Sequence, residues 1–454
     1  MRNAALMELR PFQSLSIRWD VNSLRDLRDY GDTVRAGGGQ NVGVVARAER
    51  DKLLGLDVGL ERERQMGAAI SAAPQISSWI KPRIDFSTQY SMFRDPNSPS
   101  VLQEADSSGP FRLPRRLSNS QGLGLSAAID LGRGMSMYSS DSGFVRRLSN
   151  VFQPIEVSWR RDLSSSFDGV PFTPGFGYQF GLGDITDFRD ENGVAATSAS
   201  ERHTFGVNNS LALPFGARLT SRYGRLNSTV WAKRLNTQAE IQQSTVTFPD
   251  VNLGWTIQPK LIRSFISSIG TNAAYRLEKS TTFQPSISDA TGTESSDGGG
   301  LRGEITSKTY PVTASIAWAF AGGFSTTAGW RRTDRSELRS GGLTLGNQSE
   351  LNGNVGKSFK LPQRFKARGD LRWTLGLVQS RTQSFFATDT TRRRVTDNGR
   401  WAMNTNADTD LSDNMNFSMT LSRVANYDNL YDRRFTQMVL TASLQISFFA
   451  GELR

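Results

Sequence analysis

The sequence contains no cysteine and only one histidine, and both shortages exclude chemistry. Without cysteine there can be no disulfide scaffold, thiolate metal site, iron–sulfur cluster or cysteine nucleophile. A single histidine, His203, leaves little room for metal binding or acid–base catalysis. The composition therefore predicts no enzyme, no cofactor and no metal site.

Long apolar runs are also missing. Glu8 interrupts the apolar residues 4–7, so no secretory signal is expected in this chain. The mean hydropathy of −0.42 argues against a helical membrane protein, and the aromatic content of 10% argues against disorder. The 454 residues are enough for a large core or a large barrel.

Positive charge dominates, with 54 Lys and Arg against 43 Asp and Glu, a net charge of +11. Most of the basic residues are arginines, which bind phosphate and carboxylate through paired hydrogen bonds. Nucleic acid, lipopolysaccharide phosphate and a pore lining would all suit them. The charges are dispersed rather than clustered, so we expect solvated strand ends and loops and no nucleic-acid partner.

Alternation of apolar and polar residues runs along the chain. From Ile80 to Met92 the even positions are mostly apolar and the odd positions are polar, and residues 365–377 repeat the pattern. Shorter stretches of the same kind occupy residues 15–21, 155–159, 205–213, 251–257, 415–421 and 438–448. These patterns predict β-strands, several longer than the usual five or six residues. Helical spacing is limited to one short candidate, Ser23 to Tyr30.

The uncharged stretch Thr309–Trp330 tests this interpretation because it is long enough to cross a membrane as a helix. Pro311, the pair Gly322-Gly323 and alternation on both sides of that pair favour a hairpin turning at residues 321–323.

The connections between strands are of two kinds, short ones such as residues 412–414 and long ones near residues 94–118, 183–202 and 286–300. Short turns at one end and long loops at the other are typical of an outer-membrane barrel. We therefore predict an all-β, antiparallel transmembrane outer-membrane β-barrel, or the C-terminal part of a larger one. It would form a single domain over residues 1–454 with roughly 16–22 strands. A soluble β-solenoid or sandwich is the alternative.

Lipid offers no hydrogen-bond partners, so a spanning sheet must close on itself and be apolar on its outer face. The nine tryptophans would then lie at headgroup level, or alternatively in an ordinary core. On the strand 365–377, Leu371, Trp373 and Leu375 should face lipid. The charged residues Arg368, Asp370 and Arg372 should face the lumen. Met438–Phe449 is predicted to be the closing strand and the insertion signal.

Several segments resemble a known family. They are Phe248–Arg276, Tyr310–Ala328, Ser358–Leu361 and Asp408–Asp432, which are similar, in this order, to the C-terminal part of the SprA family. That family forms the outer-membrane translocon of type IX protein secretion.

The resemblance implies a channel that passes exported proteins to the surface of a Gram-negative-type bacterium. Accessory plug or barrel subunits, together with outer-membrane lipid and lipopolysaccharide, would be its partners. The family's chains are several times longer, so the resemblance implies either a C-terminal piece or a reduced relative. A passive porin-like, adhesive or structural barrel is the alternative function.

Other candidate sites are weaker. His203 follows a long loop, where a hydrolase could hold a base, but no carboxylate and nucleophile stand at a triad-like spacing. Asp289, Glu294 and Asp297 could ligate calcium, although their spacing misses the calcium-loop pattern. The run Gly37–Gly39 is interpreted as a flexible turn rather than a phosphate loop.

Overall fold

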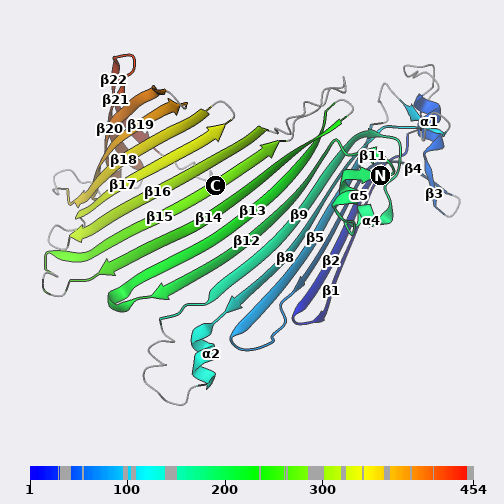
Figure 1. Ribbon diagram of the computed structural model, residues 1–454, viewed down its shortest axis with the longest axis horizontal. Helices are drawn as coiled ribbons and strands as arrows, with labels where there is room; N and C mark the ends of the chain where they lie inside the picture. The colour runs from blue at the N-terminus through cyan, green and yellow to red at the C-terminus, as the bar shows by residue number, and fades with distance from the viewer. Residues whose placement is uncertain are drawn as a thin grey trace, which may run out of the picture.

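One strongly curved antiparallel sheet makes up most of the molecule (Figure 1). The computed structural model describes residues 1–28, 30, 42–53, 56–95, 101–103, 109–138, 151–234, 237–259, 261, 264–284, 301–318, 324–339, 342–361, 369–388, 391–412 and 414–446. The predicted all-β, antiparallel fold class is confirmed.

The sheet has eighteen strands, and all but the three-residue β3 (Asp51–Leu53) are long. The seventeen long strands are β1 (Arg2–Phe12), β2 (Leu15–Asp26), β4 (Leu56–Ala72), β5 (Ile80–Arg94), β8 (Arg115–Ile129), β9 (Ile155–Val170), β12 (Ser198–Ala212), β13 (Ala217–Arg234), β14 (Thr237–Ile257), β15 (Ile266–Gln284), β16 (Leu301–Trp318), β17 (Phe324–Arg339), β18 (Gly342–Phe359), β19 (Leu371–Ala387), β20 (Arg392–Ser412), β21 (Met415–Asp428) and β22 (Arg433–Ile446).

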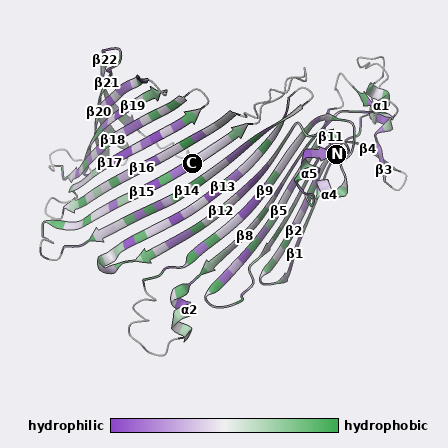
Figure 2. Ribbon diagram, in the orientation of Figure 1, coloured by the Kyte–Doolittle hydropathy of each residue, from purple (hydrophilic) through white to green (hydrophobic). Residues whose placement is uncertain are grey.

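Each long strand pairs with the next long strand along the chain, so the sheet is a meander. The uncharged stretch Thr309–Trp330 is the hairpin that its alternation predicts, because β16 and β17 pair from Trp318 opposite Phe324 to Glu304 opposite Leu338. The turn expected at residues 321–323 lies outside the described residues. Figure 2 shows hydrophilic and hydrophobic residues alternating along the strands.

In the described parts of the connections lie four short α-helices: α1 (Val42–Ala48), α2 (Leu131–Tyr138), α4 (Phe176–Gln179) and α5 (Ile185–Arg189). The helix expected from Ser23 to Tyr30 is wrong. Residues 23–26 belong to β2, where Ser23 pairs with Asn3 of β1 and with Arg64 of β4. Ladder hydrogen bonds on both sides of β2 outweigh the weak helical pattern of so short a segment.

The three long connections foreseen in the sequence all start from the same end of the sheet, which we name the α1 rim. There β5 and β8 are joined by residues 95–114, which include β6 (Leu102–Gln103) and β7 (Phe111–Arg112). The β9–β12 connection covers residues 171–197, with α4, α5, β10 (Asp190–Glu191) and β11 (Val194–Ala195). Residues 286–300 lie outside the described residues. The opposite end, the α2 rim, has mostly short turns, apart from the connection that holds α2.

The sheet has two free edges, β1 and β22, and no pairing joins them within the described residues. Both strands are exposed along their whole length. The final strand β22 starts at Arg433, earlier than the predicted Met438, and residues 447–449 lie outside the described part. Since every pairing between successive long strands is antiparallel, the first and the seventeenth run in the same direction. Direct contact between these two edges would therefore be a parallel pairing.

Candidate functional site

The two faces of the sheet differ in chemistry, and the register shows which residues share a face. Residues opposite each other on paired strands point to the same side. One row across β13–β17 joins Leu219, Leu253, Ala273, Val312 and Trp330. The adjacent row, one residue along each strand, includes Asn272 and Thr313. One face is thus apolar where the other is polar.

Most large apolar side chains that stay exposed in the strands lie on the first of these faces, although Val230 and Val439 lie on the other. Those on the first face include Ile70, Ile84, Leu125, Leu253, Val312, Trp330, Leu351, Leu377, Met419 and Leu440. A face of this kind, with side chains 38–61% exposed, is far larger than the apolar patches of ordinary soluble proteins.

A row of aromatic rings crosses the apolar face between the two rims. Some neighbouring rings are in contact, with centroids 6.0 Å apart for Phe205 and Tyr223 and 5.2 Å apart for Tyr275 and Tyr310. This upper aromatic row consists of Phe86, Trp159, Phe205, Tyr223, Phe248, Tyr275, Tyr310 and Trp330. Such rows mark the headgroup level in membrane barrels.

A second set of rings lies on the same face near the α2 rim. Trp318 and Phe324 have ring centroids 6.1 Å apart, and the Trp255 indole donates a hydrogen bond of 2.8 Å to the Phe215 carbonyl. From Tyr310 to Trp318 is eight residues, about 27 Å along the strand. At the strand tilt of membrane barrels this gives an apolar band about 20–25 Å high, which matches the hydrocarbon core that such barrels span.

The polar face is concave and rich in hydroxyl groups. Serines on adjacent strands are hydrogen-bonded, as Ser91 with Ser118 at 2.7 Å and Ser164 with Ser200 at 2.8 Å. A hollow of about 650 Å³ on this face is lined by residues of β2, β4, β5, β8, β9 and β12. A hollow spanning so many neighbouring strands requires the inner side of a curved sheet.

Charged side chains lie flat across the hollow because glycines leave room for them. Arg160 and Asp162 form a 2.7 Å ion pair over Gly122. A Cβ at Gly122 would lie only 3.0 Å from the Arg160 guanidinium. The result is a hydrated wall of small polar groups and ion pairs.

The predicted register of the strand over residues 365–377 is confirmed for the residues that the structure describes. Leu371, Trp373 and Leu375 oppose Phe359, Lys357 and Val355, on the convex face. Arg372 points to the concave face, 3.9 Å from Asp408. The strand starts at Leu371, so Asp370 precedes it, and Arg368 lies outside the described residues.

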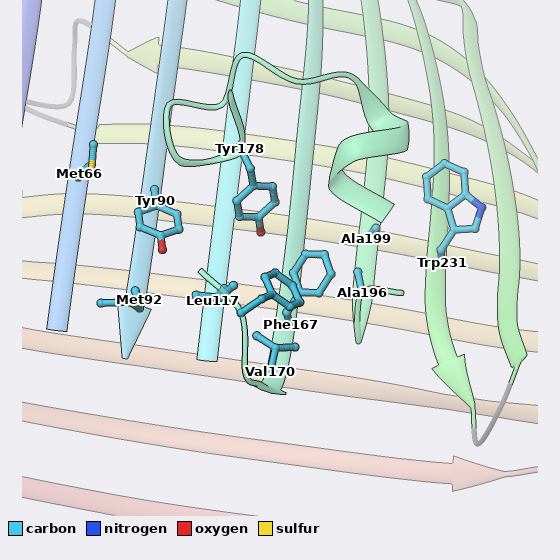
Figure 3. Close-up of a cluster of buried hydrophobic side chains, with 11 residues drawn as sticks. Met66, Tyr90, Met92, Leu117, Phe167, Val170, Tyr178, Ala196, Ala199 and Trp231 are labelled. Carbon is cyan, nitrogen blue, oxygen red and sulfur yellow. The ribbon is translucent and has the colours of Figure 1, made fainter. Parts of the chain in front are cut away.

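The connection between β9 and β12, residues 171–197, folds back over the convex face as an outer cap. Tyr178 anchors it: its hydroxyl lies 2.8 Å from that of Ser165, and its carbonyl accepts a hydrogen bond from Asn119. Figure 3 shows Tyr178 over the strands, near Tyr90 and Phe167. The buried cluster beneath the cap contains Met66, Tyr90, Met92, Leu117, Phe167, Val170, Phe172, Tyr178, Ala196, Ala199 and Trp231.

The connection between β2 and β4, which contains α1, is joined to β5 and β8 by a buried ion cluster. Glu49, just after α1, accepts hydrogen bonds from Arg94 at 3.0 Å and Arg115 at 3.3 Å. Its other oxygen accepts the backbone N–H of Leu113 at 2.9 Å. Every carboxylate oxygen therefore has a partner in a site that excludes water.

His203 lies at the lower edge of the outer cap, inside β12. Its Nε2 is 3.0 Å from Glu201, and Glu201 also binds Arg161 at 2.8 Å. Arg161 in turn binds Asp184 of the cap at 2.5 Å. The Arg161 hydrogen bond holds the pKa of Asp184 below its usual range. This geometry gives His203 a place in the ion-pair cluster that joins cap to sheet.

The remaining sequence candidates are the calcium and phosphate-loop residues. Asp289, Glu294, Asp297 and the run Gly37–Gly39 lie outside the described residues. Among the residues that are described, no group of three or more His, Asp or Glu is arranged to hold a metal ion. No helix in that part of the chain is long and apolar enough to span a membrane.

Sequence reasoning missed the outer cap. Its buried residues, such as Phe172, Tyr178 and Phe188, follow neither a strand nor a helix period. The one available signal was the density of aromatic residues in a segment that reads as a loop.

Comparisons with known proteins add little to what these residues show. No protein-family model and no curated protein matches the sequence. Among solved structures, the ferric yersiniabactin uptake receptor FyuA from Yersinia pestis is similar over 99% of this chain and 78% of that chain, with 10% identity and a TM-score of 0.28. That similarity is too low to support any argument about this chain.

Proposed function

We propose that this chain forms the wall of an outer-membrane transport barrel. The observation that carries the proposal is the two-faced sheet: a convex apolar band between aromatic rows, and a concave face of hydroxyl groups and ion pairs. Lipid would cover the convex band, and water would fill the concave side. The partners on the outside would be outer-membrane lipid and lipopolysaccharide.

The lengths of the connections at the two rims predict how the barrel is oriented in the membrane. Short turns face the periplasm and long connections face outward in bacterial outer-membrane barrels. The α2 rim would therefore be periplasmic, and the α1 rim with the outer cap would be at the cell surface.

For the cargo, we propose exported protein, with accessory plug or barrel subunits, as the resemblance to the SprA family implies. The lining is consistent with this role because serine and threonine hydroxyls on neighbouring strands bind each other and water, as Ser384 and Thr396 do at 2.6 Å. A wall of this chemistry offers a hydrated polypeptide few apolar surfaces to adhere to. It also suits small polar solutes, so passive diffusion is the second candidate.

Conductance measurements test whether the concave face lines an open channel. The chain has no cysteine, so Ser120→Cys on the concave face and Leu125→Cys on the convex face of the same strand β8 form a matched pair. In planar bilayers, attaching a bulky maleimide at position 120 should lower the conductance, and attaching it at position 125 should leave it unchanged. Equal effects at both positions, or no conductance in the unlabelled protein, would contradict a channel lined by the concave face.

A secretion assay distinguishes exported protein from small polar solutes as the cargo. A cell lacking this gene should retain proteins normally exported to the surface in its periplasm if the barrel exports protein. If surface proteins are unaffected and only the uptake of small polar solutes slows, the passive barrel is the correct function.

A further inference from the structure

The outer cap has an apolar edge that nothing in the described structure covers. Phe176 is 70% exposed and Leu182 is 63% exposed. The rings of Phe176 and Phe180 are in contact, with centroids 4.2 Å apart and their planes tilted by 31°. A 2.8 Å hydrogen bond from the Leu182 N–H to the Gly177 carbonyl holds Leu182 beside α4. We name Phe176 and Leu182 the apolar edge; Phe180, behind Phe176, packs against the buried cluster.

The contacts on either side of Leu182 fix its level on the wall. Gly181 packs against Thr88, since a Cβ at Gly181 would lie 2.8 Å from the Thr88 methyl group. Asp184 binds Arg161 at 2.5 Å. Thr88 lies two residues along its strand from Phe86 in the upper aromatic row, and Arg161 two residues from Trp159. Residues 181–184 therefore run parallel to that row, about 7 Å from it along the strands.

We propose that the apolar edge inserts into the headgroup region of the outer leaflet, so that the cap lies on the membrane surface beside the barrel. This inference rests on the proposed membrane barrel. The cap lies on the convex face, so its neighbour at this level is the leaflet and not the lumen. Exposed apolar residues at headgroup depth gain free energy by burying their surface in the acyl boundary.

Spin labelling tests the proposal on the full chain in phospholipid vesicles. The nitroxide is placed at Leu182→Cys, with Asp190→Cys as the control on the same cap and Leu253→Cys as the control in the apolar band. Collisions with oxygen report lipid, and collisions with a water-soluble nickel complex report water. We expect the ratio of oxygen to nickel collisions at position 182 to exceed that at position 190 several-fold and to fall short of that at position 253.

The two controls distinguish failure of this inference from failure of the proposed barrel. A lipid-like ratio at position 253 with a water-like ratio at position 182, equal to that at position 190, would overturn the inference and leave the barrel intact. A water-like ratio at position 253 would overturn the barrel and the inference with it.

Discussion

The hydroxyl of Tyr178 lies 2.8 Å from the hydroxyl of Ser165, and this contact fastens the outer cap to β9. Both residues are buried, and burial raises the pKa of the Tyr178 hydroxyl. The contact matters because it joins an irregular connection to the regular sheet.

Replacing Tyr178 by Phe should loosen the cap. The substitution leaves the Ser165 hydroxyl without this partner in a buried site, which costs about 1–3 kcal/mol. Limited proteolysis should cut residues 171–197 faster than in the parent chain. Tyr223→Phe, at a half-buried position of the upper aromatic row on β13, outside the cap, is the control and should leave the cleavage rate unchanged. Equal rates for Tyr178→Phe and the parent would show that the hydroxyl contact is dispensable.

Glu49→Gln should destabilise the α1 rim. Two arginines would remain buried against a neutral amide, and breaking a buried ion pair costs about 3–5 kcal/mol. Urea unfolding in vesicles, followed by tryptophan fluorescence, measures the loss. Glu8→Gln is the matched control, because Glu8 pairs with Arg10 at 2.6 Å on the exposed edge strand and its loss should cost at most about 1 kcal/mol. Similar losses for both variants would refute the role of the buried cluster.

Acid should weaken the lower edge of the cap. The pKa of Asp184 is lower in the folded protein than in the unfolded chain, chiefly because of the Arg161 hydrogen bond. Its contribution is therefore present above the unfolded value of about 3.9 and is lost as the pH falls through the folded pKa. The hydrogen-exchange protection factors of residues 181–189, corrected for the intrinsic pH dependence of amide exchange, should fall on acidification, by a small factor since the group is largely exposed. Asp184→Asn should remove this Asp184-dependent part, and an identical pH dependence in that variant would exclude the carboxylate.

The sheet could be predicted from sequence because its signal is local. In β5 and β19 each residue's face follows from its position in an alternating series, so Leu375 and Arg372 could be assigned to opposite faces. The outer cap could not be predicted, because Tyr178 is buried against Tyr90 of β5, a strand distant in sequence, and Phe188 is buried in turn against Tyr178. The direction of β22 relative to β1 likewise depends on the strand count, which alternation gives only approximately.

The most direct test of the central claim is a nitroxide scan of Val312, Thr313, Ala314 and Ser315 on β16, in the full chain in vesicles. The account predicts that Val312 and Ala314, on the convex face, collide mainly with oxygen, and that Thr313 and Ser315, on the concave face, collide mainly with the nickel complex. An alternation of period two would place lipid on one face and water on the other. Uniform accessibility along the four positions, or the inverse alternation, would contradict it.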